Sequence, residues 1–396
     1  MINLVILGST GSIGVNTLSV VRNNLASFNV FALSGNKNVD LMYKQCLEFS
    51  PNFVVMVDKN SARKLKSKLI EEALDITIMD KLIDLDYIVS QKEVDYVMAA
   101  IVGTAGLSSA YAAIDSGKRL LLANKESLVA AGNLFMDKAK QTGAEIIPVD
   151  SEHNAIHQCL ENNNKKYSSD SVDEIILTAS GGPFYRKNLE ELRNITPEEA
   201  CKHPNWSMGQ KISIDSSTMV NKALEVIEAF WLFNVPIEKL KVIIHPESIV
   251  HSMVKYLDGS FIAQLGAPDM RVPISYSLFY PEKRLAKVDS LDLTSKPLTF
   301  HEVDRDRFQA IAIVYDILER KDWVASIVFN AANEVLVESF LSGYIKYLDI
   351  TIELDNAVTT LKYKEATSIK EVIAIDQQVR EYIKARVSSL MVKANR

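Results

Sequence analysis

The sequence predicts an α/β protein with an N-terminal doubly wound parallel sheet, an α+β middle region and a C-terminal helical bundle. Up to residue 149, short runs rich in Val, Ile and Leu alternate with helical stretches, which is typical of parallel strands covered by helices on both faces. The middle region mixes strand-like runs with loops that contain glycine and proline. From residue 306 onward, helical periodicity dominates.

In the N-terminal part, each predicted strand is a short apolar run, and amphipathic stretches separate several of these runs. The strands are expected at residues 3–7, 30–33, 53–57, 96–99, 119–123 and 145–148. Helices are expected between them, for example at residues 16–24 and 39–49. Because crossovers between parallel strands are right-handed, this order predicts a doubly wound sheet.

The remainder of the chain changes character twice. Four strands are expected in the middle region, at residues 174–178, 242–244, 249–256 and 260–265. The following segment is charged and irregular, which indicates a linker at 280–305. Four helices are expected after it, at residues 308–319, 324–341, 353–361 and 377–392. The predicted domains are therefore 1–149, 150–279 and 306–396.

The 396 residues carry a net charge of −6, with 24% charged and 47% apolar residues. This composition is that of an ordinary globular protein, and its mild acidity argues against a nucleic-acid partner. Three cysteines cannot form a disulfide framework, which favours a reducing compartment such as the cytoplasm. No signal or transit peptide is expected at the start. The uncharged segment 96–114 is interrupted by glycine and serine, so no membrane span is expected.

A glycine-rich turn follows the first predicted strand directly. Residues 8–14 read GSTGSIG and open a helix, and glycines at this position let the backbone approach a pyrophosphate. The motif predicts a Rossmann-like dinucleotide-binding domain; a tight turn without a ligand is the alternative. The second strand ends in Gly35-Asn36-Lys37-Asn38, with no acid before Asp40. NADP is therefore favoured over NAD, whose ribose usually requires an acidic partner there.

Two carboxylates, Asp150 and Glu152, follow the last strand of the N-terminal part. In an extended chain both point to the same side. Such a pair repels unless a cation lies between the two groups, and oxygen ligands favour Mg²⁺ or Mn²⁺. The alternative is a solvated strand end with a helix cap.

A second polar cluster, DSSTMVNKALE, occupies residues 215–225. Hydroxyl groups at a helix start cap free N–H groups, and together with a lysine they bind phosphate. The spacing places Asn221, Lys222 and Glu225 on one helix face. The alternative is a helix cap followed by an exposed ion pair, and a third carboxylate near Asp150 would favour a functional site.

The segment 200–210 carries Trp206 and Met208 among polar residues, which indicates a lid that closes over a small ligand. A tryptophan fixed on the protein surface is the alternative. His153 and His157 have the spacing of a zinc-binding helix, but Asn154 stands where that motif requires glutamate. A zinc hydrolase is therefore disfavoured.

Six ordered stretches carry a resemblance to a known family. They are GSTGSIG (8–14), LLANKESLVAAG (121–132), PVDSEHNAI (148–156), TASGGPF (178–184), HPNWSMGQKISIDSSTMVNKALEVIEA (203–229) and HPESIVHSMV (245–254). With these stretches the chain resembles the 1-deoxy-D-xylulose 5-phosphate reductoisomerase family, and its C-terminal helices match the third domain of that family.

The resemblance implies roles for individual residues. NADPH would be bound by Thr10, Gly11, Ser12, Ile13, Gly35, Asn36, Lys37, Asn38, Asn124, Glu126 and Gly209. One Mg²⁺ or Mn²⁺ would be held by Asp150, Glu152 and Glu225. The substrate would contact Lys125, Ser151, Glu152, Ser180, His203, Trp206, Met208, Ser216, Asn221, Lys222 and Glu225, with His251 near its end. The catalytic residues would be Lys125, Asp150, Glu152, His203 and Glu225.

The resemblance also implies an activity: retro-aldol and aldol rearrangement of 1-deoxy-D-xylulose 5-phosphate, then reduction by NADPH to 2-C-methyl-D-erythritol 4-phosphate, in a homodimer of the non-mevalonate isoprenoid pathway. The family commonly reads Ala-Gly-Lys-Asn at residues 35–38, so the glycine has moved by one place here. Two alternatives remain. A semialdehyde or homoserine dehydrogenase would need no metal carboxylates, and a non-catalytic NADPH sensor would have lost Lys125 or a carboxylate.

Overall fold

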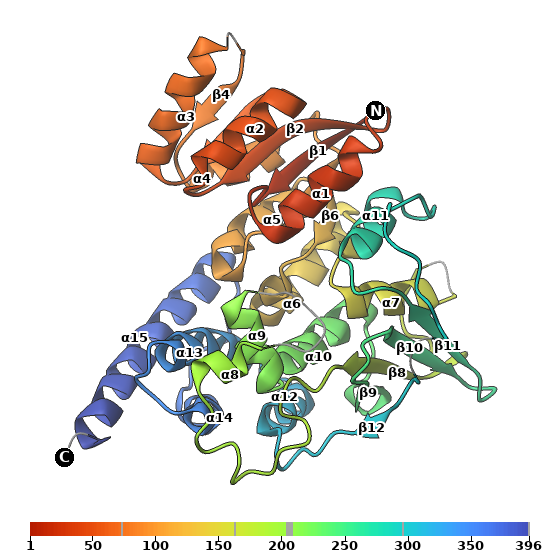
Figure 1. The fold of residues 1–396 in the computed structure, drawn as a ribbon, viewed down its shortest axis with the longest axis vertical. Coiled ribbons are helices and arrows are strands. Elements are labelled where there is room, and N and C mark those ends of the chain that lie inside the picture. The colour runs from red at the N-terminus through yellow and green to blue at the C-terminus, as the bar shows by residue number, and fades with distance from the viewer. Residues whose placement is uncertain (73, 162–163, 203–208, 295–296, 395–396) are drawn as a thin grey trace. The chain divides into compact units, whose positions relative to one another are not determined.

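The structure, a computed structural model, describes residues 1–72, 74–161, 164–202, 209–294 and 297–394 (Figure 1). Its contacts group the chain into two compact units. Unit 1 comprises Met1–Ser127, Phe135–Asn154 and Asp269–Asp289, and unit 2 comprises Leu128–Leu134, Ala155–Pro268 and Ser290–Arg396. Residues 269–289, expected in the catalytic domain and the linker, thus group with the N-terminal strands. The division into three functional domains stays a prediction.

Unit 1 is built on a seven-stranded parallel sheet with the order β4-β3-β2-β1-β5-β6-β7. Its strands are β1 (Ile2–Leu7), β2 (Phe28–Gly35), β3 (Phe53–Met56), β4 (Thr77–Met79), β5 (Tyr96–Ala99), β6 (Arg119–Leu122) and β7 (Ile146–Pro148). The six predicted strands are confirmed. The sequence did not predict β4, because this edge strand has only three residues.

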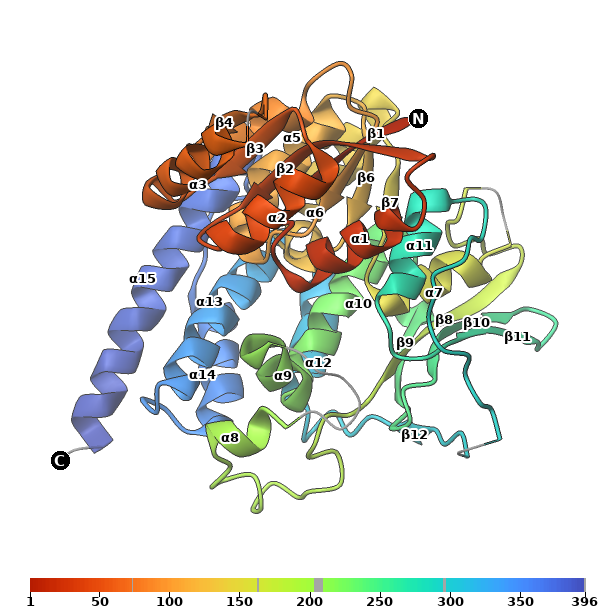
Figure 2. The ribbon, with the colours of Figure 1, turned by 45° about the horizontal axis from the view of Figure 1, so that its top comes forward.

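The helices of this part are α1 (Ser12–Arg22), α2 (Val39–Phe49), α3 (Lys59–Glu71), α4 (Ile83–Val89), η1 (Gly103–Gly106), α5 (Leu107–Asp115), α6 (Lys125–Thr142), α7 (Ser151–Cys159) and α11 (Arg271–Phe279). The helices up to α6 connect the parallel strands, and α7 and α11 follow the last strand. Helix α2 has the predicted bounds, since Asn38 caps its start and Ser50 takes a left-handed conformation at its end. In Figures 1 and 2, α1 and α2 lie over the same face of the sheet. The strand order reverses between β1 and β5, where open α/β sheets bind their ligands.

Helix α11 is held in unit 1 by both polar and apolar contacts. The backbone oxygen of Pro148 accepts hydrogen bonds from Ser277 Oγ at 2.9 Å and from Asn154 Nδ2 at 2.8 Å. On the same helix, Ile274 and Leu278 are buried in the apolar core beneath the sheet. The end of β7, which carries the first pair of candidate carboxylates, is therefore fixed by a segment more than a hundred residues later in the chain.

Unit 2 contains a mixed five-stranded sheet with the order β11-β10-β8-β9-β12. Its strands are β8 (Val172–Ala179), β9 (Leu240–Ile244), β10 (Val250–Tyr256), β11 (Phe261–Leu265) and β12 (His301–Glu302). Strands β8 and β9 are parallel and the other pairs are antiparallel. The four predicted strands are confirmed, and the two-residue strand β12 lies inside the predicted linker.

The helices of unit 2 include all four that were expected at the C-terminal end. They are α8 (Pro197–Ala200), α9 (Gln210–Ser217), α10 (Val220–Phe233), η2 (Ile237–Lys239), α12 (Gln309–Glu319), α13 (Trp323–Leu341), α14 (Tyr347–Thr360) and α15 (Ile369–Ala394). Helix α13 is long and apolar enough to cross a membrane, but 83% of its 18-residue apolar window is buried within the protein. That burial is typical of a core helix.

Helix α6 is interrupted near its middle. Ala131 has φ −143° and ψ 29°, which are not helical values. At the next residue, a Cβ atom on Gly132 would lie 2.2 Å from the Trp231 ring of α10. Glycine is therefore required at this point for the close approach of the two helices.

Candidate active site

The turn between β1 and α1 is built by glycines. Gly8 has φ +79°, and a Cβ atom there would lie 2.7 Å from the backbone oxygen of Ala100. A Cβ atom on Gly14 would lie 2.4 Å from the backbone oxygen of Gly8. These contacts close the backbone into a tight loop at the N-terminus of α1, whose cap is Gly11. Residues 10–13 are exposed or half-buried. The Gly11 N–H donates to the backbone oxygen of Gly8 at 3.0 Å, and the backbone N–H groups of Thr10, Ser12 and Ile13 lie at a helix start, where anions bind.

The end of β2 lies next to this turn. A Cβ atom on Gly35 would lie 3.3 Å from Thr10 Oγ1 and 3.0 Å from Met42 Cε. The glycine that is shifted by one place therefore sits against the candidate pyrophosphate loop. Asn38 caps α2 by accepting a hydrogen bond from the Leu41 backbone N–H at 3.2 Å. Its amide nitrogen remains the group of that side chain that can donate to a ligand.

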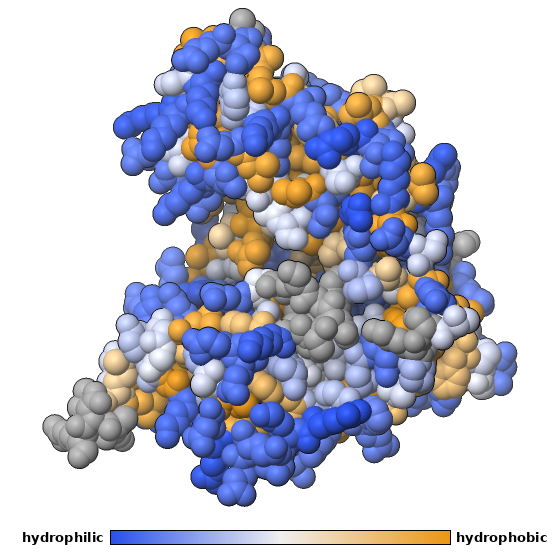
Figure 3. Space-filling model, viewed as in Figure 1, coloured by the Kyte–Doolittle hydropathy of each residue, from blue (hydrophilic) through white to orange (hydrophobic). Residues whose placement is uncertain are grey.

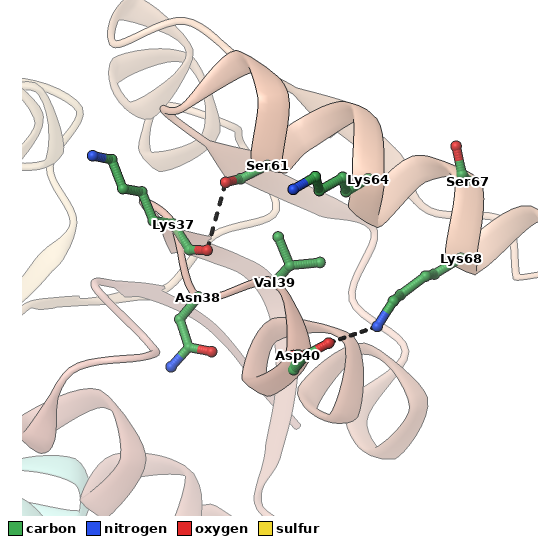
Figure 4. A pocket seen from close by; sticks show the side chains of 8 residues that line it. All are labelled: Lys37, Asn38, Val39, Asp40, Ser61, Lys64, Ser67 and Lys68. Carbon is green, nitrogen blue, oxygen red and sulfur yellow. Dashed lines mark hydrogen bonds and ion pairs between the residues drawn. The ribbon is translucent and has the colours of Figure 1, made fainter.

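A pocket of about 580 Å³ opens beside Lys37 (Figure 4). Its lining residues come from the β2–α2 connection and from α3, and they are Lys37, Asn38, Val39, Asp40, Ser61, Lys64, Ser67 and Lys68. The Ser61 hydroxyl donates to Asp58 Oδ1 at 2.7 Å, and its oxygen lies 3.5 Å from the backbone oxygen of Lys37. At the other end of the pocket Lys68 pairs with Asp40 at 2.6 Å. Figure 4 shows Lys64 reaching along α3 toward Ser61.

Ser61 and Lys64 are pocket residues that the sequence did not predict. Helix α3 is capped by Asp58, whose side chain accepts a hydrogen bond from the Ser61 backbone N–H at 2.8 Å. Its lysines are spaced like those of any solvated helix face, and Figure 3 shows hydrophilic residues gathered over α2 and α3. Only the pairing of β2 with β3 brings this helix next to Lys37.

Asn124 occupies the N-cap position of α6, two residues after β6, and its side chain makes no capping hydrogen bond to the helix. Its side chain is 3% exposed, and Nδ2 donates to the backbone oxygen of Gly103 at 2.9 Å. Among the described residues nothing donates to its buried Oδ1 atom. An unsatisfied buried acceptor is costly, so the site suits a ligand with an N–H donor, such as a carboxamide. The neighbouring Glu126 is also buried.

The first pair of carboxylates lies at the start of α7. The prediction that Asp150 and Glu152 extend from the strand is wrong, because the chain has already turned helical and the Asn154 N–H donates to the Asp150 backbone oxygen at 2.8 Å. One oxygen atom from each carboxylate nevertheless lies within 4.8 Å of the other. The Ser151 hydroxyl donates to Glu152 Oε2 at 2.6 Å.

Lys125 brings a positive charge to this pair. Its Nζ atom lies 2.5 Å from Asp150 Oδ2, and both side chains are about 15% exposed. His153, fully buried on α7, has Nδ1 4.0 Å from the same Asp150 oxygen. The sequence grouped His153 with His157 and rejected zinc, so it missed this neighbour of Asp150. The ammonium group partly offsets the mutual repulsion of two carboxylates, as a bound cation would.

The third predicted carboxylate, Glu225, lies fully buried on α10. The predicted shared face is confirmed: Asn221 Nδ2 donates to Glu225 Oε1 at 2.5 Å, and Lys222 Nζ contacts Glu225 Oε2 at 2.5 Å. Lys222 is 3% exposed. A buried ion pair of this kind costs desolvation, so the alternative of an exposed surface pair is wrong.

The connection from α9 to α10 forms an elbow. Hydroxyl groups here were expected to cap the following helix, and Thr218 Oγ1 does accept a hydrogen bond from the Val220 N–H at 3.4 Å. The Ser217 and Thr218 hydroxyl groups also donate to the backbone oxygen of Ile214 at 2.8 and 3.2 Å. Ser216 and Ser217 thus end α9, and Met219 turns the chain with φ +62° before α10 begins.

A glycine loop packs closely against this elbow. A Cβ atom on Gly182, which has φ +65°, would lie 2.8 Å from the backbone oxygen of Ser216. The Gly182 N–H donates to Ser180 Oγ at 3.2 Å. The loop after β8 therefore brings Ser180 to the end of α9, beside the candidate phosphate residues.

The remaining predicted residues are placed as follows. Gly209 caps α9, with open space around its Cβ position. His251 is buried on β10. His203, Trp206 and Met208, and with them most of the predicted lid, lie outside the described residues.

Three family models match the chain. They are described as 1-deoxy-D-xylulose 5-phosphate reductoisomerase, matching residues 4–132, its C-terminal domain, matching 146–233, and the DXP reductoisomerase C-terminal domain, matching 265–382. The 1-deoxy-D-xylulose 5-phosphate reductoisomerase of Francisella tularensis subsp. novicida (strain U112) is 52% identical over 96% of this chain and 97% of its own. The same enzyme of Ruthia magnifica subsp. Calyptogena magnifica is 47% identical with the same coverage.

Solved structures are similar over nearly the whole chain. A DOX-P reductoisomerase in complex with NADPH, fosmidomycin and magnesium has a TM-score of 0.92 and 41% identity, covering 98% of this chain and 99% of that one. The Zymomonas mobilis 1-deoxy-D-xylulose 5-phosphate reductoisomerase in complex with NADPH has a TM-score of 0.90 and 40% identity, with the same coverage.

Proposed function

Because the chain belongs to the 1-deoxy-D-xylulose 5-phosphate reductoisomerase family, we propose that the residues described above carry that reaction. The chain has the activity of the family, the conversion of 1-deoxy-D-xylulose 5-phosphate to 2-C-methyl-D-erythritol 4-phosphate, with NADPH and a divalent metal as cofactors. The observation that carries this conclusion is 52% identity over 96% of the chain to a reductoisomerase.

NADPH fits the crevice of unit 1. Its pyrophosphate would accept hydrogen bonds from the backbone N–H groups of Thr10, Ser12 and Ile13 and would lie against Gly11, in the loop that Gly8 and Gly14 keep narrow. Its 2′-phosphate would lie in the pocket beside Lys37, with Lys64 as an additional donor. The orphan Oδ1 atom of Asn124 would accept from the nicotinamide carboxamide. Residues 36, 38 and 126, together with Gly209, would complete the cofactor site.

The carboxylates fit a hard divalent cation. We propose that Asp150 and Glu152 hold Mg²⁺ or Mn²⁺ and that Glu225 is the third ligand, since these side chains supply only oxygen atoms. When bound, the cation supplies Lewis-acid polarisation of the substrate carbonyl group. Lys125, 2.5 Å from Asp150, orients that carboxylate and can donate hydrogen bonds to substrate oxygen atoms.

The elbow and the glycine loop form the phosphate end of the substrate site. Ser180 and Ser216 would donate hydroxyl hydrogen bonds to the phosphate, and Asn221 would donate through its amide. Lys222 would supply charge from a buried position, where charge acts more strongly than in water. Binding energy from this remote group orients the carbon skeleton for the rearrangement and for hydride transfer from NADPH. Ser151, His203, Trp206 and Met208 would enclose the skeleton.

The rearrangement also requires protons at defined atoms. The Lys125 ammonium group is a donor that is almost removed from solvent, and Glu152, with its Oε2 held by the Ser151 hydroxyl, is the neighbouring acceptor. This pair can hold and return a proton at the substrate hydroxyl groups while a closed site excludes water.

A decisive experiment measures the consumption of NADPH by its absorbance. The pure protein is incubated with 1-deoxy-D-xylulose 5-phosphate and Mg²⁺ or Mn²⁺, with and without a chelator. Glu225→Gln removes one anionic ligand, so we expect weaker metal binding and a large loss of turnover with unchanged NADPH affinity. Glu238→Gln, at an exposed position, is the matched control. Metal-dependent turnover retained by the Glu225 variant would exclude this ligand. Turnover by the wild type with the metal removed would exclude a metal-dependent rearrangement.

We also propose a homodimer located in the cytoplasm. Cys46 and Cys159 are buried and form no disulfide within the described part of the chain, which fits a reducing compartment. Sedimentation equilibrium should give about 88 kDa, twice the 44.2 kDa of one chain. A mass of one chain at micromolar concentration would contradict the dimer.

A further inference from the structure

Asp215 is a buried carboxylate that the proposed reaction does not use. It lies on α9 with 1% of its surface exposed. Its Oδ1 atom accepts a hydrogen bond from Asn333 Nδ2 at 2.8 Å, and Lys211 Nζ lies 2.9 Å from its Oδ2. Asn333 belongs to α13 and is fully buried. An amide from a distant part of the chain thus holds a charge in the interior of unit 2.

Asp215 lies in the chain directly before the residues proposed to bind phosphate. The next residue is Ser216, whose backbone oxygen is packed against Gly182 in the glycine loop after β8. Four residues later α10 begins at Val220, directly before Asn221 and Lys222. The last turn of α9 therefore determines where the elbow, and with it the hydroxyl and ammonium donors, lies.

We propose that Asn333 is a positioning residue for phosphate recognition, acting through Asp215 on the elbow that carries Ser216, Asn221 and Lys222. This inference rests on the proposed phosphate site. Without Asn333, Asp215 would keep only the partly exposed Lys211 as a charged partner among the contacts described here, and a buried carboxylate that loses a donor moves toward water or toward another donor. Such a movement shifts the elbow.

The direct test is Asn333→Ala, with steady-state kinetics in the sugar phosphate and in NADPH. A displacement of about 1 Å in a binding group costs on the order of a hundredfold, so we expect the KM for the sugar phosphate to rise about tenfold to hundredfold. The KM for NADPH should stay unchanged. Inorganic phosphate, used as a competitive inhibitor, should lose affinity by a similar factor.

Asn330→Ala is the matched control. Asn330 lies on the same helix, is fully buried, and has its amide 3.5 Å from Glu334 rather than on α9. The Asn330→Ala variant loses the same side-chain atoms as Asn333→Ala, so we expect a comparable loss of thermal stability. Its KM for the sugar phosphate should stay unchanged. If both variants raise this KM equally, Asn333 acts only through the packing of α13 and the inference is wrong.

Two further variants keep the test decisive if Asn333→Ala does not fold. Asn333→Asp conserves the volume and places two carboxylates against each other, so it should raise the same KM. The double variant Asn333→Asp with Asp215→Asn restores one donor and one acceptor across the contact. Its KM for the sugar phosphate should return most of the way to the wild-type value. Failure of this recovery, or a KM unchanged in Asn333→Asp, would overturn the inference. A wild-type protein that is not inhibited by phosphate would overturn the proposed phosphate site itself.

Discussion

Replacing Lys64 with alanine removes an ammonium group from the pocket at the end of β2. Lys37 supplies a second ammonium group from the opposite side, and the Ser61 hydroxyl lies between the two segments. If this pocket binds the 2′-phosphate of NADPH, Lys64→Ala and Lys37→Ala each remove one charge-assisted hydrogen bond to that phosphate. NADH has no phosphate at this position, so its binding should not change.

The size of the effect follows from the exposure of the pocket. A hydrogen bond to a charged group contributes about 1.5–3 kcal/mol, and the lysines here are exposed to water, which places them at the low end. About 1.4 kcal/mol corresponds to a tenfold change in affinity. Each variant should therefore raise the KM for NADPH about tenfold and reduce the NADPH-to-NADH preference by the same factor. The difference should shrink in high salt, because the Debye length falls to about 3 Å at 1 M.

Lys68→Ala provides the matched control for this prediction. Lys68 lines the same pocket and has the same charge, but its amino group is paired with Asp40 at 2.6 Å. The steady-state KM for each nucleotide should stay close to that of the wild type in this variant. If Lys68→Ala and Lys64→Ala raise the KM for NADPH equally, the pocket acts only through its overall charge. An unchanged preference in both the Lys37 and Lys64 variants would refute the assignment of the pocket.

Further predictions concern stability. Burial, with added repulsion from Lys165 and Lys166, lowers the pKa of His157 to about 3 from an ordinary 6.5, so the unfolded chain takes up a proton at pH values where the folded protein does not. The free energy of unfolding should fall as the pH drops from 6.5 toward 3, by about 2 kcal/mol at pH 5 from this residue. In urea titrations at pH 7 and pH 5, His157→Gln should lose less stability than the wild type between the two pH values. Equal losses in both proteins would contradict this role of His157. Gly132→Ala should lower the free energy of unfolding by about 1–3 kcal/mol, because the new methyl group meets the Trp231 ring, which Trp323 contacts at 4.7 Å between ring centroids; an unchanged urea midpoint would contradict that packing.

Local patterns in the sequence were sufficient for most of the fold. Strand β1 and helix α2 were predicted nearly to the residue, because apolar runs and helix caps are local signals. The glycine turn and the face shared by Asn221, Lys222 and Glu225 were predictable for the same reason, since spacing along a helix fixes which side chains meet.

The features that failed depend on distant contacts. The extended arrangement of Asp150 and Glu152 was wrong because α7 starts at once, in a segment bonded to α11. Lys64 joins the pocket only through the pairing of neighbouring strands, and nothing in its own helix distinguishes it from a solvated lysine. The hydrogen bond from Asn333 to Asp215 links residues 118 positions apart. No pattern within a single element predicts such a contact.

The interleaving of the two units along the chain has a consequence for protein engineering. Unit 1 is assembled from three separate segments, and the boundaries of the first two fall inside α6 and α7. A nucleotide-binding unit with this connectivity cannot be exchanged between relatives as one continuous cassette. A chimera that joins residues 1–149 of one parent to the remainder of another would split the parentage of Pro148 and Ser277, which are hydrogen-bonded at 2.9 Å. Working chimeras should therefore require all three segments from the same parent.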